Sequence, residues 1–196
     1  MSEDIINRVR QTFIDSISVK QEILDNESYE VLIDAGNIIA NSISNGGKLL
    51  LCGNGGSAAD AQHLAAEFVS KLARDRDPLP ALALTVDSSM ITAIGNDYGY
   101  ENIFVRQISA NGASGDVLLA ISTSGSSLNV VKAAAQAKEM GIKVIGLTGQ
   151  KSGSLDDHCD VVLKAPSEIT AVIQECHILI EHSLCEHVEN EIFFRE

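Results

Sequence analysis

The chain of 196 residues contains no tryptophan, only three prolines and few aromatic side chains, which make up 4% of it. It has four cysteines: Cys52, Cys159, Cys176 and Cys185. They lack both the CxxC spacing of a zinc knuckle and the density of a disulfide scaffold. The longest uncharged run, residues 117–131, contains five hydroxyl side chains and is shorter than the ~20 apolar residues of a membrane helix. No apolar signal segment opens the sequence. We therefore expect a reduced, cytoplasmic protein with no membrane partner.

Positive charge is also scarce. Lys and Arg number 14 against 27 Asp and Glu, so the net charge is −13. Such an acidic chain has no general attraction for nucleic acid, and an anionic ligand needs a locally favourable site. Hydrophobic residues make up 45% and charged residues 21%, an ordinary globular composition. The length suits one domain, which we expect to span residues 1–196.

Apolar residues recur with a helical period in two opening segments, from Ile6 to Leu24 and from Leu32 to Ile43. Short continuous apolar runs then follow, typical of parallel strands covered on both faces: 48–52, 81–86, 117–122, 143–148 and 161–165. Helix-like stretches separate most of these runs: 58–72, 88–94, 127–140 and 154–157. A last helix is expected over residues 168–189, with Ser167 as its N-cap.

This alternation predicts the α/β class, with a flavodoxin-like, doubly wound, five-stranded parallel sheet. N-terminal helices (1–46) precede the α/β core (47–166), and a C-terminal helix and tail (167–196) follow it. The first and last helices carry more apolar surface than one sheet face can cover. We therefore expect them to pack between the subunits of an oligomer.

The first candidate binding loop, Gly53-Asn54-Gly55-Gly56-Ser57, lies between a predicted strand and a predicted helix. Its glycines permit positive φ and close backbone approach, and the helix N-terminus offers N–H groups to an anion. The string also fits the dinucleotide fingerprint GxGxxA. However, the acid at the end of the next strand, Asp87, lies 34 residues after Gly53, against ~20 in that motif. An anion site is favoured over a dinucleotide site and over a turn without a ligand.

The second candidate loop, Ser122-Thr123-Ser124-Gly125-Ser126-Ser127, follows a very apolar strand and precedes a helix. Hydroxyls and backbone amides at a helix start can hold a phosphate without Lys or Arg, because the helix dipole and hydrogen bonds supply the attraction. The alternative is simple N-capping, which needs one serine rather than several hydroxyls. A phosphate site is favoured.

Two predicted helices carry side chains that a metal ion can bind. His63 and Glu67 are four residues apart and share a helix face. Gln174 and His182 are eight apart, about 80° around the last helix. Imidazole, carboxylate and amide groups suit zinc or a similar ion, with a position left for substrate. The spacing alone is not specific, because a His–Glu pair four apart is usually a surface interaction.

Four motifs, in order, resemble those of the phosphoheptose isomerases, which belong to the SIS (sugar isomerase) class. They are CGNGGSAADAQHLAAE from Cys52 to Glu67, Gly95-Asn96-Asp97, GDVLLAISTSGSS from Gly115 to Ser127, and QECHILIEH from Gln174 to His182. The resemblance covers nearly the whole chain, as far as about Glu191. It implies an SIS domain.

This resemblance implies an aldose–ketose isomerase that converts D-sedoheptulose 7-phosphate to D-glycero-D-manno-heptose 7-phosphate through an enediol. In that family the reaction is the first step toward the ADP-heptose of the lipopolysaccharide core. The resemblance also implies a cytoplasmic homotetramer with one Zn²⁺ per subunit, held at the positions of His63, Glu67, Gln174 and His182.

The same resemblance implies that Glu67 is the catalytic base and His182 its acid partner. The implied substrate-binding positions are Asn54, Gly55, Gly56, Ser57, Glu67, Asn96, Asp97, Ser122, Thr123, Ser124, Ser127 and Gln174. A different class of function is a non-catalytic SIS-domain protein that binds a sugar phosphate and regulates a partner such as a replication initiator. That branch lacks the residues matching Glu67 and His182, and this chain has both, which favours the enzyme.

Overall fold

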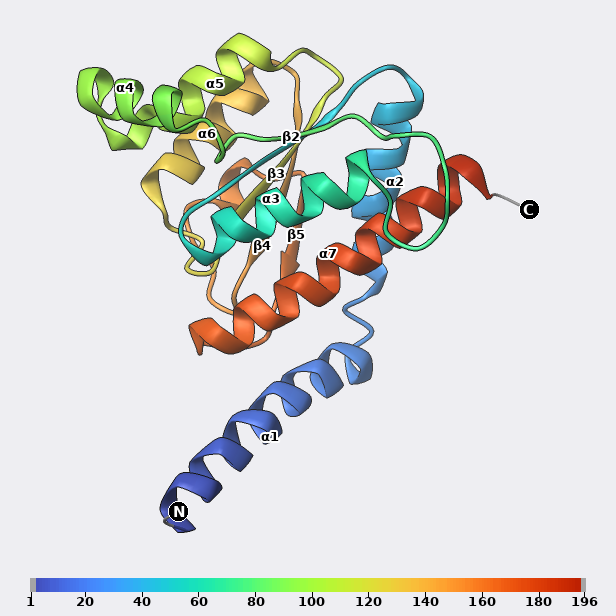
Figure 1. The fold of residues 1–196 in the computed structure, drawn as a ribbon, viewed down its shortest axis with the longest axis vertical. Helices are drawn as coiled ribbons and strands as arrows, with labels where there is room; N and C mark the ends of the chain where they lie inside the picture. The colour runs from blue at the N-terminus through green and yellow to red at the C-terminus, as the bar shows by residue number, and fades with distance from the viewer. Residues whose placement is uncertain (1–2, 195–196) are drawn as a thin grey trace.

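A five-stranded parallel sheet with helices on both faces forms the body of the computed structural model, which describes residues 3–194 (Figure 1). The strand order is β2-β1-β3-β4-β5, and all four pairings are parallel. The strands are β1 (Leu49–Gly53), β2 (Ala81–Ala83), β3 (Val117–Ser122), β4 (Lys143–Thr148) and β5 (Val161–Lys164). This order is that of a flavodoxin-like sheet, so the predicted fold class is confirmed.

The chain moves outward from β1 to β2 and then returns past β1 to β3, so the winding direction reverses between β1 and β3. Both strands are buried along their whole length, which explains their continuous apolar sequences. In register, Gly53 lies beside Ile121, and Ser122 beside Thr148. The carboxyl ends of β1, β3 and β4 therefore meet at one edge, where open α/β sheets bind ligands.

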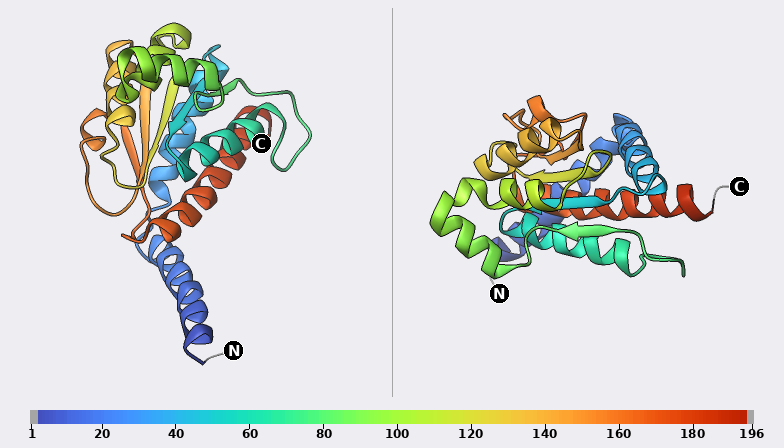
Figure 2. Two further views of the ribbon diagram at one scale, coloured as in Figure 1. Left: turned by 60° about the vertical axis from the view of Figure 1, so that its left-hand side comes forward. Right: turned by 90° about the horizontal axis from the view of Figure 1, so that it is seen from above.

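The helices pack in two layers, one on each face of the sheet, as the two views of Figure 2 show. Odd-numbered positions of β1, such as Leu49 and Leu51, join a core with α2, α3 and α7, while Leu50 joins the opposite core with α5 and α6. The helices are α1 (Glu3–Asp25), α2 (Glu30–Ser44), α3 (Gly56–Val69), α4 (Ser88–Tyr98), α5 (Ile103–Asn111), α6 (Leu128–Glu139) and α7 (Thr170–Phe193). Two 3₁₀ turns span Tyr100–Asn102 and Asp156–His158.

Some predicted elements need correction. The second strand ends at Ala83 rather than at residue 86, because the chain then turns and Asp87 caps α4 by accepting a hydrogen bond from the Met90 N–H (2.8 Å). This capping role leaves the dinucleotide interpretation without its acid. The stretch 154–157 is not an α-helix: residues 154 and 155 form a turn, and a 3₁₀ helix follows at Asp156–His158. Helix α5 was not predicted, although it buries Phe104 and Ile108.

Ser167 is not the N-cap of the last helix. Helix α7 begins at Thr170, and its N-cap position, Ile169, has no side-chain capping bond. The Ser167 hydroxyl instead accepts a hydrogen bond from the Ile169 N–H at 3.1 Å, in the turn that precedes the helix. The error arose because the serine lies only three residues before the helix, and sequence pattern does not fix helix ends to that precision.

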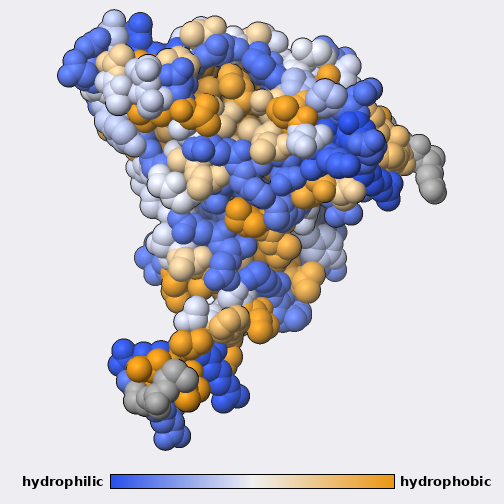
Figure 3. Space-filling model, in the orientation of Figure 1, coloured by the Kyte–Doolittle hydropathy of each residue, from blue (hydrophilic) through white to orange (hydrophobic). Residues whose placement is uncertain are grey.

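Helix α1 projects away from the sheet and touches the rest of the chain mainly near its C-terminal half, where Ser16 donates to the Glu175 carboxylate on α7 (Figure 1). Its apolar stripe is exposed: Val9 is 54%, Phe13 67% and Ile17 65% exposed. Figure 3 shows hydrophobic residues gathered on this projecting part. The described chain therefore leaves apolar helix surface uncovered, as the sequence pattern predicted. Across residues 3–194, no helix pairs the length with the apolar character that a membrane crossing requires.

Candidate active site

The glycine loop after β1 is shaped so that α3 starts directly against the end of the strand. Gly55 has φ +57°, in the left-handed region that favours glycine. A Cβ at Gly53 would lie 2.6 Å from the Ser57 main-chain oxygen, so this position has no room for a side chain. The first turn of α3 therefore presents its N–H groups at the edge where the winding of the sheet reverses.

In the serine loop after β3, the hydroxyls lie against one another. The Ser122 hydroxyl donates to the Ser127 hydroxyl at 3.0 Å, and the Ser124 hydroxyl accepts from the Ser126 N–H at 3.2 Å. Ser127 occupies the N-cap position of α6, yet its side chain makes no capping bond. N-capping therefore does not explain this hydroxyl. A cluster of hydroxyls at a helix N-terminus suits a phosphate.

The two loops are tied together by side-chain amides. Asn54, in the glycine loop, and Asn129, in the first turn of α6, exchange two hydrogen bonds of 2.8 Å. The Tyr100 hydroxyl also donates to Asn54 Oδ1 at 3.0 Å. Asn54 was predicted from its motif, whereas Asn129 and Tyr100 were not. Their contact depends on how three segments meet, and no spacing in the sequence marks it.

His63, Glu67 and His182 form a cluster between α3 and α7. The Nε2 atoms of His63 and His182 lie 2.7 Å apart, and His63 Nε2 lies 3.7 Å from Glu67 Oε1. One ligand atom from each of the three lies within 4.8 Å of the others, and all three residues are half-buried. Helices α3 and α7 run side by side in the same direction, which brings His63 and Glu67 next to His182 (Figure 1). Two imidazole nitrogens and one carboxylate are a donor set that fits zinc.

Gln174, the fourth predicted ligand, lies apart from this cluster within the chain. A Cβ at Gly56 would lie 2.1 Å from Gln174 Nε2, so the Gln174 amide fills the space beside the first turn of α3. His63 is two turns further along that helix, about 10 Å at 1.5 Å per residue. The structure therefore places Gln174 beside the glycine loop and the other three predicted ligands together.

Asn96 and Asp97 lie on α4, where the Asn96 amide donates to the Asp97 carboxylate at 2.8 Å. Both residues are exposed. Within the part of the chain that the structure describes, no hydrogen bond connects either residue to the two loops. A polar hollow of about 210 Å³ adjoins the serine loop instead, and its walls include Thr123, Ser124, Gln150 and Ser167.

Two buried carboxyl groups near the cluster were missed by the sequence analysis. Glu181, on α7, is fully buried, and Asp60, on α3, is 7% exposed. Among residues 3–194, neither oxygen of Glu181 has a hydrogen-bond partner. Burial, and next the charge of Asp60, raises the pKa of Glu181 to about 9. Glu181 is therefore a neutral acid near pH 7. Both residues lie within the motifs quoted above, but no spacing marks them as a pair, because their burial results from the packing of α3 on α7.

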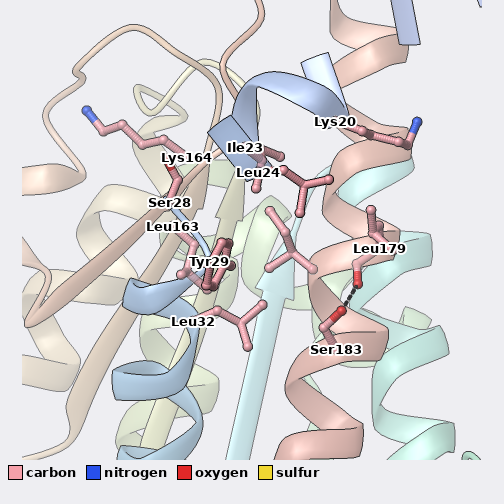
Figure 4. A pocket seen from close by; sticks show the side chains of 11 residues that line it. Lys20, Ile23, Leu24, Ser28, Tyr29, Leu32, Leu163, Lys164, Leu179 and Ser183 are labelled. Atoms are coloured by element: carbon pink, nitrogen blue, oxygen red, sulfur yellow. Dashed lines mark hydrogen bonds between the residues drawn. The ribbon is translucent and has the colours of Figure 1, made fainter. Parts of the chain in front are cut away.

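A separate apolar cavity of about 280 Å³ lies between α1, α2, β5 and α7. Figure 4 shows Ile23, Leu24, Tyr29 and Leu32 around this space, and Leu179 on the α7 side. No predicted site residue lines it. Its apolar walls do not suit a sugar phosphate, so the candidate site is the polar edge of the sheet.

Comparison with known proteins assigns the family. The protein-family model of the SIS domain matches residues 12–149 of this chain. Phosphoheptose isomerase 2 of Campylobacter jejuni is 49% identical over 192 residues, which cover 97% of this chain and 96% of that protein. The chain belongs to the phosphoheptose isomerase family.

Solved structures of phosphoheptose isomerases agree with this assignment. The protein from Neisseria gonorrhoeae matches with a TM-score of 0.89 at 44% identity, covering 95% of this chain and 99% of that one. The protein from Francisella tularensis matches with a TM-score of 0.91 at 39% identity, covering 97% and 100%. As a phosphoheptose isomerase the chain is an enzyme of the aldose–ketose isomerase type, so the predicted family and activity are confirmed.

Proposed function

We propose that this enzyme interconverts D-sedoheptulose 7-phosphate and D-glycero-D-manno-heptose 7-phosphate, the first step toward ADP-heptose for the lipopolysaccharide core. The observation that carries the proposal is the cluster of His63, Glu67 and His182 between α3 and α7. Both helices begin at the ligand-binding edge of the sheet. Helix α3 starts at the glycine loop and supplies two of the three residues. An ionisable cluster and an anion-binding edge are the parts that a sugar-phosphate isomerase needs.

The proposed chemistry transfers one proton between C1 and C2 of the sugar. Glu67 takes the proton from C1 of the ketose, which gives a cis-enediol, and returns it to C2 to give the aldose. His182 protonates the oxygen on C2 and removes the proton from the oxygen on C1, so the atoms balance. A well-placed base contributes about 10²–10⁴-fold to the rate.

Binding of the phosphate is assigned to Ser122, Thr123, Ser124 and Ser127, with the N-terminus of α6. The four hydroxyls and the helix dipole attract the dianion without a Lys or Arg in the loop. Seven further residues are proposed to hold the sugar chain: Asn54, Gly55, Gly56, Ser57, Asn96, Asp97 and Gln174.

We further propose one Zn²⁺ per subunit, held by His63, Glu67 and His182. Gln174, the fourth ligand implied by the resemblance, lies beside the glycine loop in this chain and is assigned to the sugar. When bound, the ion polarises the sugar carbonyl and stabilises negative charge on its oxygen. The support is the donor set itself, with two imidazole nitrogens and a carboxylate oxygen gathered within 4.8 Å.

The proposed assembly is a cytoplasmic homotetramer. Exposed apolar residues along α1, together with the apolar cavity beside its C-terminal end, offer the surface that partner subunits would cover. The free thiols Cys52, Cys159, Cys176 and Cys185 fit a reducing compartment.

Direct turnover tests the proposed function. Purified protein, loaded with zinc, is incubated with D-sedoheptulose 7-phosphate, and the aldose is followed by NMR. We expect conversion to an equilibrium mixture, with solvent deuterium entering C2 of the aldose. Binding of the ketose without conversion or exchange would contradict the proposed reaction and support the sugar-phosphate-binding alternative.

A further inference from the structure

A buried ion pair connects the loop after α3 to helix α7. Arg76 lies in that loop and Glu189 on α7, and their side chains are 1% and 2% exposed. Glu189 Oε1 lies 2.8 Å from Arg76 Nη2 and accepts a hydrogen bond from Arg76 Nε at 2.9 Å. The same oxygen accepts from the Leu72 N–H at 3.1 Å. A paired arrangement of this kind, shielded from water, has a fixed geometry.

The remaining guanidinium donors of Arg76 hold the end of α3. Nη2 donates to the main-chain oxygen of Glu67 at 2.8 Å, and Nη1 donates to that of Phe68 at 2.7 Å. These carbonyls belong to the last turn of the helix, where the backbone oxygens have no partner within the helix. Nη1 also donates to the Asp77 carbonyl at 3.0 Å, so all three guanidinium nitrogens donate hydrogen bonds. Arg76 therefore caps α3 and binds the peptide group of Glu67 itself.

Glu189 connects this cap to the helix that carries His182. The two residues are seven apart on α7, which is about two helical turns. One ion pair thus links the backbone of Glu67 on one helix to the helix of His182 on the other. Both of these residues belong to the cluster described above.

We propose that Arg76, held in place by Glu189, is a positioning residue for the isomerisation. It fixes the backbone of Glu67 so that the carboxylate stays aligned with His182 and with the sugar carbon. The proposal rests on the proposed role of Glu67 as the base. A misplacement of about 1 Å in a catalytic group can lower a rate about 10²-fold, so a cap outside the site can control the chemistry.

The test replaces both partners at once, as Arg76→Met with Glu189→Met. Removing both charges avoids leaving one charge buried without a partner, which would threaten folding. We expect kcat to fall at least 10-fold at saturating zinc, KM for D-sedoheptulose 7-phosphate to stay within about threefold, and thermal unfolding to show a folded protein. A role in stability alone would not change kcat of the folded protein.

Arg76→Lys keeps the charge but not the planar fork that reaches Glu189 and two carbonyls. We expect it to lower kcat in the same way and to remain folded, so it serves if the double variant does not fold. Asp116→Asn is the matched control. Asp116 is also a buried carboxylate that accepts from a cation and from backbone N–H groups, but it lies at the amino edge of the sheet. We expect it to lower stability without lowering kcat.

Wild-type kcat in both folded variants would overturn the proposal and assign the ion pair a structural role. Glu67→Gln is measured in parallel, because it tests the role of Glu67 as the base separately from the role of Arg76 in positioning it. Full kcat in Glu67→Gln would remove the base on which the positioning role depends and so would also overturn it. Absence of turnover in the unaltered protein would instead contradict the proposed function itself.

Discussion

The ring nitrogens Nε2 of His63 and His182 face each other at 2.7 Å, although 119 residues separate the two histidines in the sequence. The rings meet edge to face, with centroids 5.0 Å apart. Two imidazoles in this position either share one hydrogen or bind a common ion, since a neutral imidazole offers one donor and one acceptor nitrogen. Glu67 Oε1 lies 3.7 Å from His63 Nε2 and can serve as a third ligand to a common ion.

The first prediction concerns the metal. Zinc added to chelator-treated protein should raise its melting temperature, because an ion that binds only the folded state stabilises it, by about 2.7 kcal/mol at 100 times Kd. His182→Gln should weaken this effect. Metal analysis and thermal unfolding provide the measurement. A chelated protein that keeps full activity and takes up no zinc on dialysis would contradict a catalytic ion.

The second prediction concerns the base. Glu67→Gln keeps the shape of the side chain but cannot accept a proton from carbon, so kcat should fall about 10²–10⁴-fold. Sugar phosphate should still bind, because its phosphate is assigned to a different loop. The assay is repeated at saturating zinc, which separates loss of the base from loss of a ligand. Deuterium exchange at C2 reports proton abstraction directly, and undiminished exchange would assign the base to another residue.

The third prediction concerns the phosphate. Ser124→Ala combined with Ser127→Ala removes two hydrogen bonds to a charged group, each contributing about 1.5–3 kcal/mol. KM for the sugar phosphate should therefore rise at least about tenfold. Ser126→Ala is the matched control from the same loop, because its hydroxyl is exposed and donates only to the Ser124 carbonyl. Equal KM values in all three proteins would place the phosphate elsewhere.

The fourth prediction concerns stability in acid. His177 is fully buried, and its Nε2 lies 3.1 Å from the Thr148 carbonyl. Burial lowers its pKa from 6.5 to about 4, while the Thr148 hydrogen bond acts in the opposite direction. The folded state therefore binds fewer protons than the unfolded state between these two values. Stability should fall as the pH drops from about 6.5 to about 4, by on the order of 3 kcal/mol from this residue.

Urea unfolding at several pH values measures this effect. His177→Gln keeps an N–H donor for Thr148 but does not titrate, so its stability should depend less on pH over the same window. His158→Gln, in the 3₁₀ turn at 156–158, is the control and should keep the slope of the unaltered protein. Identical slopes in all three proteins would show that His177 does not contribute.

The fifth prediction concerns assembly. Light scattering of the purified chain should give about four times its mass of 20.9 kDa. Phe13→Glu places a charge on the exposed apolar stripe of α1 and should lower the measured mass, whereas Gln11→Glu, on its polar side, should not. A monomer at micromolar concentration would contradict the tetramer.

Local chemistry explains which parts of the fold and site were predictable. Strands β1 and β3 are buried on both faces, so their apolar runs identified them, and the glycine and serine loops follow directly from those strand ends. Helix α5 was missed because its pattern is short and follows a 3₁₀ turn. The end of the edge strand β2 was misplaced because three paired residues leave little periodicity.

Relations between segments were beyond the sequence pattern. The contact of Tyr100 with Asn54, and the burial of Glu181 beside Asp60, depend on how helices and turns approach one another in space. The same holds for Arg76. In the sequence it is one cation in a charged loop, yet its side chain is buried and all three guanidinium nitrogens donate hydrogen bonds. Spacing identified His63 and Glu67 as a pair, but only the common direction of α3 and α7 joins them to His182.

The placement of β1 between β2 and β3 has a consequence for synthesis of the chain. Its neighbour on the inner side, β3, begins about 70 residues later, so β1 leaves the ribosome long before that partner exists. At 5–20 residues per second, the delay is roughly 3–14 s. During this time Leu49–Cys52 is an apolar strand with an open edge, the type of segment that associates with other chains. The interval before β3 emerges is therefore when a nascent chain most needs a chaperone.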